Sequence, residues 1–209
     1  MKLVIMGPIG VGKGTQAKQL CQKLGIVHIS TGDIMRKHIA EETPVGVKIK
    51  TILASGGYVD DDLTTELLKT RLAEPDTAAG FILDGYPRTV AQADTLATLT
   101  DIKKVIFLTA NKDIIIKRLS GRRVCSGCGA MYHVENHKPA VAGVCDACDE
   151  HLVQRPDDNE EVISKRLQIF EEQTLPLKDF FQERNLLAEI DGTGAVADVT
   201  NDILARLQG

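Results

Sequence analysis

A glycine-rich loop near the start of the chain constrains the fold more than any other feature. It comprises Met6–Gln16, MGPIGVGKGTQ, and lies between the apolar run Lys2–Ile5 and a helical pattern that runs to Leu24. A strand that leads through a glycine loop into a helix forms a nest of backbone N–H groups at the positive end of the helix dipole. Such a nest binds polyphosphate, and Lys13 and Thr15 offer an ammonium and a hydroxyl to the phosphates and their metal. A merely flexible turn is the alternative, but it does not explain the strand, the lysine and the helix together.

Short apolar runs recur along the chain and alternate with helical patterns. This alternation predicts a three-layer α/β fold, in which a parallel sheet carries helices on both faces. Ligands of such sheets bind beyond the carboxyl ends of the strands. The expected strands are Lys2–Met6, Ile26–Ile29, Phe81–Leu83, Val105–Leu108 and Leu186–Ile190.

Caps and apolar residues at helical spacing mark the expected helices. Two segments interrupt the alternation of strands and helices. Residues 30–59 are helical throughout, whereas residues 122–158 are rich in glycine and cysteine and poor in helical periodicity. Each is expected to form a small subdomain on the phosphate side of the sheet. The main expected helices are 31–42 with Thr31 as N-cap, 44–55, 60–72, 111–119, 159–181 with any bend near Pro176, and 198–207.

Composition and charge limit the classes of protein to which the chain can belong. Its 209 residues suffice for one α/β domain, and 43% hydrophobic and 26% charged residues are ordinary for a globular protein. The net charge of −4 argues against a protein that mainly binds nucleic acid, because such surfaces carry a basic excess. No apolar run approaches a membrane span, and the first strand leaves no room for a cleavable signal, so we expect a cytosolic protein. A compact fold with a self-contained site predicts a monomer.

Four of the five cysteines form two CxxC pairs, Cys125 with Cys128 and Cys145 with Cys148. Two such pairs can arrange four thiolates tetrahedrally around Zn²⁺. Four protein ligands leave no position for water, so the predicted zinc is structural and stabilises a segment too small and polar to be held by burial. The alternative is four reduced or disulfide-linked cysteines, which the spacing and the expected reducing compartment disfavour.

Arginines concentrate near the predicted strand ends. Their planar, permanently charged side chains can hold phosphate oxygens in pairs, although any one of them could be a solvated surface residue. Arg88 stands apart, because it follows an apolar strand directly in the motif DGYPR. Asp84 ends that strand, an arrangement that holds Mg²⁺ in phosphate-loop enzymes, and the alternative is an ordinary N-cap. The arginines are Arg36, Arg88, Arg118, Arg122, Arg123, Arg155 and Arg166.

Taken together, these motifs resemble the adenylate kinase family. The resemblance extends from residue 1 to about residue 207 and includes the glycine between Lys13 and Thr15, which departs from the strict GxxxxGK[ST] pattern but is the family's usual form. It implies a P-loop nucleoside-monophosphate kinase fold with a core of residues 1–29, 60–120 and 159–209, an AMP-binding subdomain at 30–59 and a zinc-binding lid at 121–158. The motifs are GPIGVGKGTQ, STGD with Arg36, DGYPR with Gln92, GRR at 121–123, and RPDD at 155–158 with Arg166.

The resemblance also implies Mg²⁺-dependent, reversible phosphoryl transfer from ATP to AMP, and roles for individual residues. On the ATP side these are Gly10, Val11, Gly12, Lys13, Gly14, Thr15, Arg118, Arg122, Met131, Tyr132 and Gly194. On the AMP side they are Thr31, Arg36, Gly57, Tyr58, Val59, Gly85, Tyr86, Pro87, Arg88, Gln92, Arg155 and Arg166. The expected catalytic groups are Lys13, Asp84, Arg88, Arg122, Arg155 and Arg166.

Two positions depart from the family pattern, and two other functions stay open. Ile9 replaces a frequent proline, and Gly194 lies where many members have Lys or Gln. A relative that uses GTP as donor, or UMP or CMP as acceptor, is one alternative; the amide of Gln92 favours adenine because it can pair with N1 and N6. A zinc-ribbon protein that binds nucleic acid is the other. The acidic net charge and the sparse aromatic residues count against it.

Overall fold

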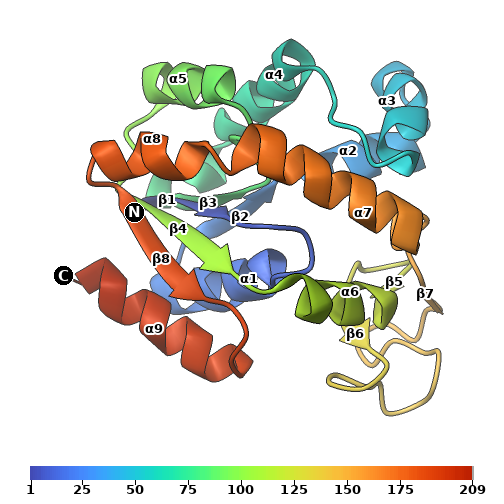
Figure 1. The fold of residues 1–209 in the computed structure, drawn as a ribbon. Helices are drawn as coiled ribbons and strands as arrows, with labels where there is room; N and C mark the ends of the chain where they lie inside the picture. The colour runs from blue at the N-terminus through green and yellow to red at the C-terminus, as the bar shows by residue number, and fades with distance from the viewer. Residues whose placement is uncertain (209) are drawn as a thin grey trace.

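A five-stranded parallel sheet lies at the centre of the computed structural model, which describes residues 1–208 (Figure 1). The strands lie in the order β2-β3-β1-β4-β8, and neighbouring strands pair in parallel register. The expected sheet is confirmed, and each observed strand end lies within one residue of its predicted position. The strands are β1 (Lys2–Met6), β2 (Val27–Ser30), β3 (Phe81–Asp84), β4 (Lys104–Thr109) and β8 (Leu187–Asp191).

Two hydrophobic cores lie on opposite faces of the sheet, because successive strand residues point in opposite directions. Leu3 and Ile5 belong to one core, whereas Val4 and Met6 belong to the other. Each core is closed by helices, which confirms the three layers. The covering helices are α1 (Lys13–Leu24) and α9 (Val196–Gln208) on one face, and α4 (Asp61–Leu72), α5 (Val90–Leu99) and α8 (Leu177–Glu183) on the other (Figure 1). None of the helices among residues 1–208 is long and apolar enough to cross a membrane.

The two segments that interrupt the alternation have small cores of their own. Between β2 and α4 the chain forms two helices whose side chains Met35 and Ile49 pack with Val59. After α6 it forms a separate antiparallel sheet in the order β6-β5-β7, which the sequence did not reveal because each strand is too short to show alternation. The first segment contains α2 (Thr31–Ala40) and α3 (Pro44–Ala54), and the second contains β5 (Arg122–Cys125), β6 (Met131–His133) and β7 (Leu152–Val153). Outside them lie η1 (Pro75–Ala79), which precedes β3, and α6 (Lys112–Ser120), which follows β4.

The N-cap of α2 is Ser30, so the prediction of Thr31 was wrong by one residue. The hydroxyl of Ser30 accepts a hydrogen bond from the backbone N–H of Asp33 at 3.2 Å. Thr31 is already helical, and its hydroxyl donates instead to the carbonyl oxygen of Gly85 at 2.9 Å. Because Ser and Thr are both good caps, sequence alone did not distinguish them.

The long helix expected over residues 159–181 is interrupted by a π turn. Helix α7 (Glu160–Ile169) leads into η2 (Phe170–Thr174), in which the N–H of Leu175 donates to the carbonyl of Phe170 at 2.8 Å. The bend was expected near Pro176, but the regular helix ends before that residue. π turns interrupt helices mostly at functional sites, and this one brings Thr174 into contact with Arg88.

Candidate active site

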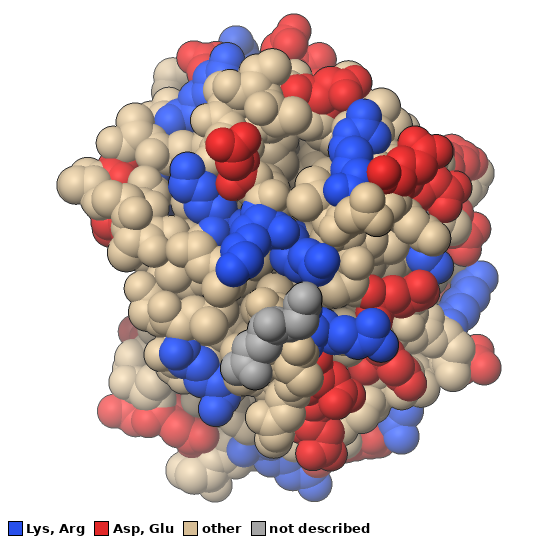
Figure 2. Space-filling model, turned by 90° about the vertical axis from the view of Figure 1, so that its left-hand side faces the viewer, with Lys and Arg blue, Asp and Glu red and all other residues tan. Residues whose placement is uncertain are grey.

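The carboxyl ends of the parallel strands open onto a cavity of about 880 Å³. The phosphate loop, the end of β3 and the three-stranded sheet all contribute to its walls, together with Lys13 and six of the seven arginines named above. Arg123 is the exception: it is adjacent to Arg122 in β5, so the two side chains leave opposite faces of the strand. Outside the cavity, for example on the face shown in Figure 2, acidic and basic side chains occur next to each other. The cavity therefore concentrates positive charge in a chain whose net charge is −4.

The end of the phosphate loop leaves the first amides of α1 free for an anion. Gly12 is the N-cap of α1, has φ +110° and supplies no side-chain hydrogen bond to the first turn, so the leading N–H groups of the helix face the cavity without a cap. Gly7, at φ +135°, lets the loop pass close to β4, because an added Cβ would lie 2.3 Å from the carbonyl oxygen of Leu108. Gly7 is therefore required by the close approach to β4, whereas Gly12 is favoured only by its positive φ.

Lys13 is folded back onto this loop. Its ammonium donates to the carbonyl oxygens of Gly7 and Pro8, each at 2.8 Å. Desolvation lowers the pKa of Lys13 to about 8, a shift that Asp84 opposes and three arginines of the cavity reinforce. A polyphosphate beside the ammonium would favour its charged form.

Asp84 lies beside the phosphate loop at the end of β3. Its Oδ2 atom is 3.4 Å from a ring nitrogen of His28, and a Cβ added at Gly14 would lie 3.6 Å from the same oxygen. Asp84 and Thr15 both line the cavity. Mg²⁺ prefers carboxylate and hydroxyl oxygens beside phosphates, so this donor set fits the expected ion.

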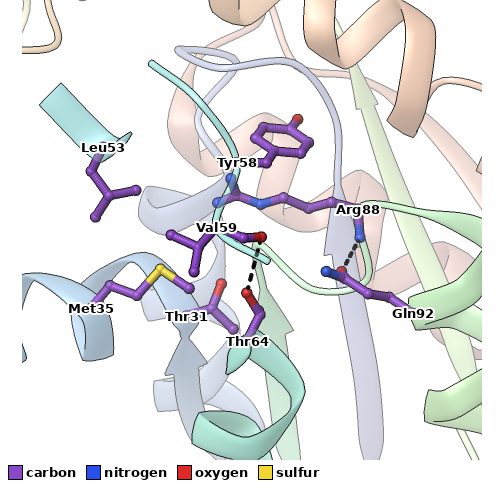
Figure 3. A pocket seen from close by; sticks show the side chains of 8 residues that line it. All are labelled: Thr31, Met35, Leu53, Tyr58, Val59, Thr64, Arg88 and Gln92. Carbon is purple, nitrogen blue, oxygen red and sulfur yellow. Dashed lines mark hydrogen bonds between the residues drawn. The ribbon is translucent and has the colours of Figure 1, made fainter. Parts of the chain in front are cut away.

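Arg88 is held by contacts from three directions. Its Nε donates to the carbonyl of Gly85 at 2.8 Å, and its guanidinium lies 4.7 Å from the centre of the Tyr58 ring (Figure 3). Its main-chain carbonyl accepts from the hydroxyl of Thr174 at 3.0 Å, and that hydroxyl is 3.2 Å from the hydroxyl of Tyr58. Sequence reasoning missed Thr174, because nothing in a helical run marks a π turn.

Next to Arg88 is a second, much smaller cavity of about 10 Å³ (Figure 3). Gln92 closes one side: its Oε1 accepts from the main-chain N–H of Arg88 at 2.7 Å, and its Nε2 donates to Asp61 at 2.6 Å. The space suffices for no more than about one water molecule. The lining residues are Thr31, Met35, Leu53, Tyr58, Val59, Thr64, Arg88 and Gln92.

Arg118 joins the phosphate loop to the turn after β8. Its guanidinium donates to the carbonyl oxygens of Val11 at 3.0 Å, Gly192 at 2.8 Å and Thr193 at 3.2 Å. Burial lowers the pKa of Arg118 from its usual value. Gly194 lines the same wall, and an added Cβ there would meet only Val199 at 3.5 Å, so packing does not require a glycine.

Three of the four remaining cavity arginines are paired with aspartates, among them Arg36 with Asp33 at 2.5 Å, and one is not. Arg122 forms an ion pair with the fully buried carboxylate of Asp158, and Arg166 forms one with Asp157. Among residues 1–208, no hydrogen-bond acceptor lies within reach of the buried Nε of Arg155. Burial and the neighbouring arginines lower the pKa of Arg155 to about 10. This corner of the cavity therefore has an unsatisfied donor and an excess of positive charge.

The four cysteines of the two CxxC pairs meet in one cluster, with all sulfurs within 4.8 Å of one another. The Sγ atoms of Cys125 and Cys148 are 3.4 Å apart, and those of Cys128 and Cys145 are 3.6 Å apart. Four sulfurs about 2.3 Å from a central Zn²⁺ would be roughly 3.8 Å apart, so the cluster is compatible with a tetrahedral zinc site. A hydrogen bond from the hydroxyl of Tyr132 is the main reason why the pKa of Cys145 falls to about 6.

The predicted nucleotide-binding residues thus fall into three groups: those that line the large cavity, those that line only the small cavity, and those that line neither. Most line the large cavity, and Thr31, Val59 and Gln92 line only the small one. Tyr132 lines the large cavity but directs its hydroxyl to Cys145. Gly57 and Tyr86 line neither cavity; the ring of Tyr86 is buried in the core, and its hydroxyl lies 3.0 Å from that of Thr65.

Comparison with known sequences decides the family. The family described as adenylate kinase matches residues 5–186. The chain belongs to the adenylate kinase family. Among its relatives, an adenylate kinase of Citrifermentans bemidjiense is 48% identical over the whole of both chains, and one of Finegoldia magna is 44% identical over all of this chain and 99% of its own. An adenylate kinase of Moorella thermoacetica is 47% identical over 95% of this chain and 94% of its own.

Membership of the adenylate kinase family confirms the resemblance drawn from the motifs. It also confirms the P-loop nucleoside-monophosphate kinase fold and the prediction that the chain is a phosphotransferase of this class. The roles of individual residues, the division into subdomains and the bound metals stay predictions.

Proposed function

We propose that the chain catalyses reversible phosphoryl transfer from Mg²⁺-bound ATP to AMP, giving two molecules of ADP. The observation that carries this proposal is the meeting of an uncapped phosphate loop, Asp84 and six arginines in one cavity. Two nucleotides bound end to end bring several negative charges together, and transfer between them depends on positioning and on screening of charge. Membership of the adenylate kinase family supports the same reaction.

The donor binds along the phosphate loop. The amides of residues 10–15 hold the phosphates, and the ammonium of Lys13 moves from two carbonyl oxygens to the β- and γ-phosphates. The planar guanidinium of Arg118, fixed by three carbonyl oxygens, packs against the adenine. Met131, Tyr132 and Gly194 complete the ATP side.

The acceptor binds on the other side of the cavity. Arg36 and Arg88 hold the phosphate of AMP, and Arg122, Arg155 and Arg166 span the phosphoryl group in transfer. The unpartnered Nε of Arg155 supports this assignment, because a phosphate oxygen would supply the acceptor that it lacks. The adenine binds beside Gln92, together with Thr31, the segment Gly57–Val59 and Gly85–Pro87.

Closure of two subdomains accompanies binding. The cavity beside Gln92 is too small for a base, so the walls that Met35, Leu53 and Val59 supply must move, and all three belong to residues 30–59. Residues 121–158 form the lid, which carries Arg122 and Arg155 over the phosphates. Closure excludes water, which would otherwise compete as the acceptor.

Two metals fit the donor sets. Asp84 and Thr15 hold Mg²⁺ with the phosphates of ATP, where the ion neutralises charge. Cys125, Cys128, Cys145 and Cys148 hold Zn²⁺ in a closed shell that ties the lid together. We also propose that the protein acts as a cytosolic monomer, because the cavity walls come from one chain and free thiolates suit a reducing compartment.

The test is to mix the protein with ATP, AMP and Mg²⁺ and to measure ADP, with GTP as a second donor and UMP and CMP as second acceptors. Arg88→Ala should lower turnover by about two orders of magnitude or more, because it removes a charge that screens the transferred group. Arg123→Ala is the matched control: its guanidinium donates to the carbonyls of Ser120 and Arg122 outside the cavity, so turnover should stay near normal. Near-normal turnover of Arg88→Ala would refute the assignment of the acceptor site.

A further inference from the structure

The side-chain amide of Gln92 is fixed in one direction. Gln92 is 3% exposed, and each end of its amide has one partner. Oε1 accepts from the main-chain N–H of Arg88 at 2.7 Å (Figure 3), and Nε2 donates to Oδ1 of Asp61 at 2.6 Å. A main-chain N–H can only donate and a carboxylate can only accept, so neither partner tolerates the amide turned round.

Asp61 is itself held in place. Its second oxygen, Oδ2, accepts from the hydroxyl of Thr89 at 2.6 Å. Thr89 is the N-cap of α5, and the same hydroxyl accepts from the backbone N–H of Gln92 at 3.2 Å. The carboxylate therefore links the first turn of α4 to the first turn of α5 through two hydrogen bonds, and it cannot rotate away from the amide without breaking both.

The orientation of the Gln92 amide decides with which purine base it can form hydrogen bonds. One N–H of Nε2 and one lone pair of Oε1 remain after these bonds are made. Adenine presents a donor at N6 and an acceptor at N1, which match Oε1 and Nε2. A 6-oxopurine presents an acceptor at O6 and a donor at N1, in the opposite order. To form hydrogen bonds with a 6-oxopurine, the Gln92 amide would have to turn round. Its Oε1 would then face the carboxylate of Asp61, and its Nε2 would face the main-chain N–H of Arg88, so both present contacts would be lost.

We propose that Asp61 is a specificity-determining residue for the acceptor. By fixing the amide of Gln92, it admits AMP and rejects 6-oxopurine monophosphates such as GMP and IMP. This inference rests on the proposed binding of AMP beside Gln92. It assigns the discrimination between purines to a residue that need not touch the base.

The test compares kcat/KM for AMP and for GMP in four variants. In Asp61→Asn, the hydroxyl of Thr89 donates to the new carbonyl oxygen, so the new amide nitrogen faces Gln92. It then opposes the wild-type direction of the Gln92 amide, which only the main-chain N–H of Arg88 still enforces. The ratio of kcat/KM for AMP to that for GMP should fall by about tenfold or more. Thr89→Val frees one oxygen of Asp61 and should shift the ratio in the same direction by less. Asp62→Asn removes the same charge from an exposed neighbour in the same turn and should leave the ratio unchanged.

Gln92→Ala separates failure of this inference from failure of the proposed function. Suppose that Gln92→Ala lowers the ratio of kcat/KM for AMP to that for GMP, whereas Asp61→Asn lowers both kcat/KM values equally and leaves the ratio unchanged. Asp61 is then only structural, and the inference is wrong. If Gln92→Ala leaves the ratio at the wild-type value, the base does not bind beside Gln92. That result would overturn the proposed acceptor site and this inference with it.

Discussion

Replacing Thr174 by valine removes one hydroxyl from the centre of a short hydrogen-bonded chain. That hydroxyl donates its proton to the main-chain carbonyl of Arg88 at 3.0 Å, so the hydroxyl of Tyr58, 3.2 Å away, donates to it. Valine has nearly the same shape, but it leaves both partners without a bond at a position that is 5% exposed. The free energy of unfolding should fall by about 1–3 kcal/mol, the usual cost of leaving buried polar groups unpaired.

The same change should weaken AMP binding. The Tyr58 ring, 4.7 Å from the guanidinium of Arg88, loses the bond that fixes it. A contact of this kind contributes about 0.5–2 kcal/mol, so we expect the KM for AMP to rise by roughly 2- to 30-fold while the KM for ATP changes little. Steady-state kinetics with each substrate varied in turn would measure both values, and urea denaturation would measure the loss of stability.

Two control variants separate a specific effect from a general loss of stability. Thr174→Ser keeps the hydroxyl and should restore the KM for AMP. Thr200→Val also removes a buried hydroxyl, which donates to Gln16 at 2.7 Å on the opposite side of the sheet. It should lower stability by a similar amount without changing the KM for AMP. If Thr174→Val lowered stability but left the KM for AMP at the wild-type value, the hydroxyl would not position Arg88.

Three further predictions concern the loop and the metal. Because the pKa of Lys13 is about 8 in the free protein and a polyphosphate raises it, ATP binding at pH 8 should take up about half a proton, and almost none at pH 6. Calorimetry in buffers of different ionisation enthalpy would detect this uptake, and its absence at pH 8 would count against the placement of Lys13. Chelation of zinc should lower the melting temperature, with a smaller effect on turnover below that temperature; loss of activity at unchanged stability would instead indicate a catalytic metal. Gly7→Ala should lower the free energy of unfolding by about 2 kcal/mol or more, since its Cβ would lie 2.3 Å from the carbonyl oxygen of Leu108, whereas Gly12→Ala, with open space around it, should cost only about 1 kcal/mol of backbone strain.

Local patterns predict the sheet and the phosphate loop well, because their causes are local. Buried parallel strands must be apolar along their length, as Leu3–Met6 and Val105–Leu108 are. The loop needs glycine at positive φ and a lysine at a fixed distance along the chain. Helix caps are also local, but the choice between Ser30 and Thr31 depended on the hydrogen bond that Thr31 makes with Gly85, more than fifty residues away.

Contacts between distant segments account for most of what the sequence left undetermined. The π turn that carries Thr174 and the bond between Asp61 and Gln92 each join parts of the chain whose proximity no local pattern reveals. No local pattern distinguishes Arg122 from Arg123; the family resemblance selects Arg122, and in the structure Arg122 is the one of the two that lines the cavity. Motif resemblance therefore predicts the residues of the site, whereas the structure shows which other residues contact them.

Crystallisation with a dinucleotide inhibitor, in which a polyphosphate joins two adenosines, tests most directly whether two nucleotides bind end to end. We expect its polyphosphate to run from the amides around Lys13 to the guanidinium of Arg88, with one adenine beside Arg118 and the other beside Gln92. A polyphosphate bound away from both Lys13 and Arg88 would contradict the proposed site.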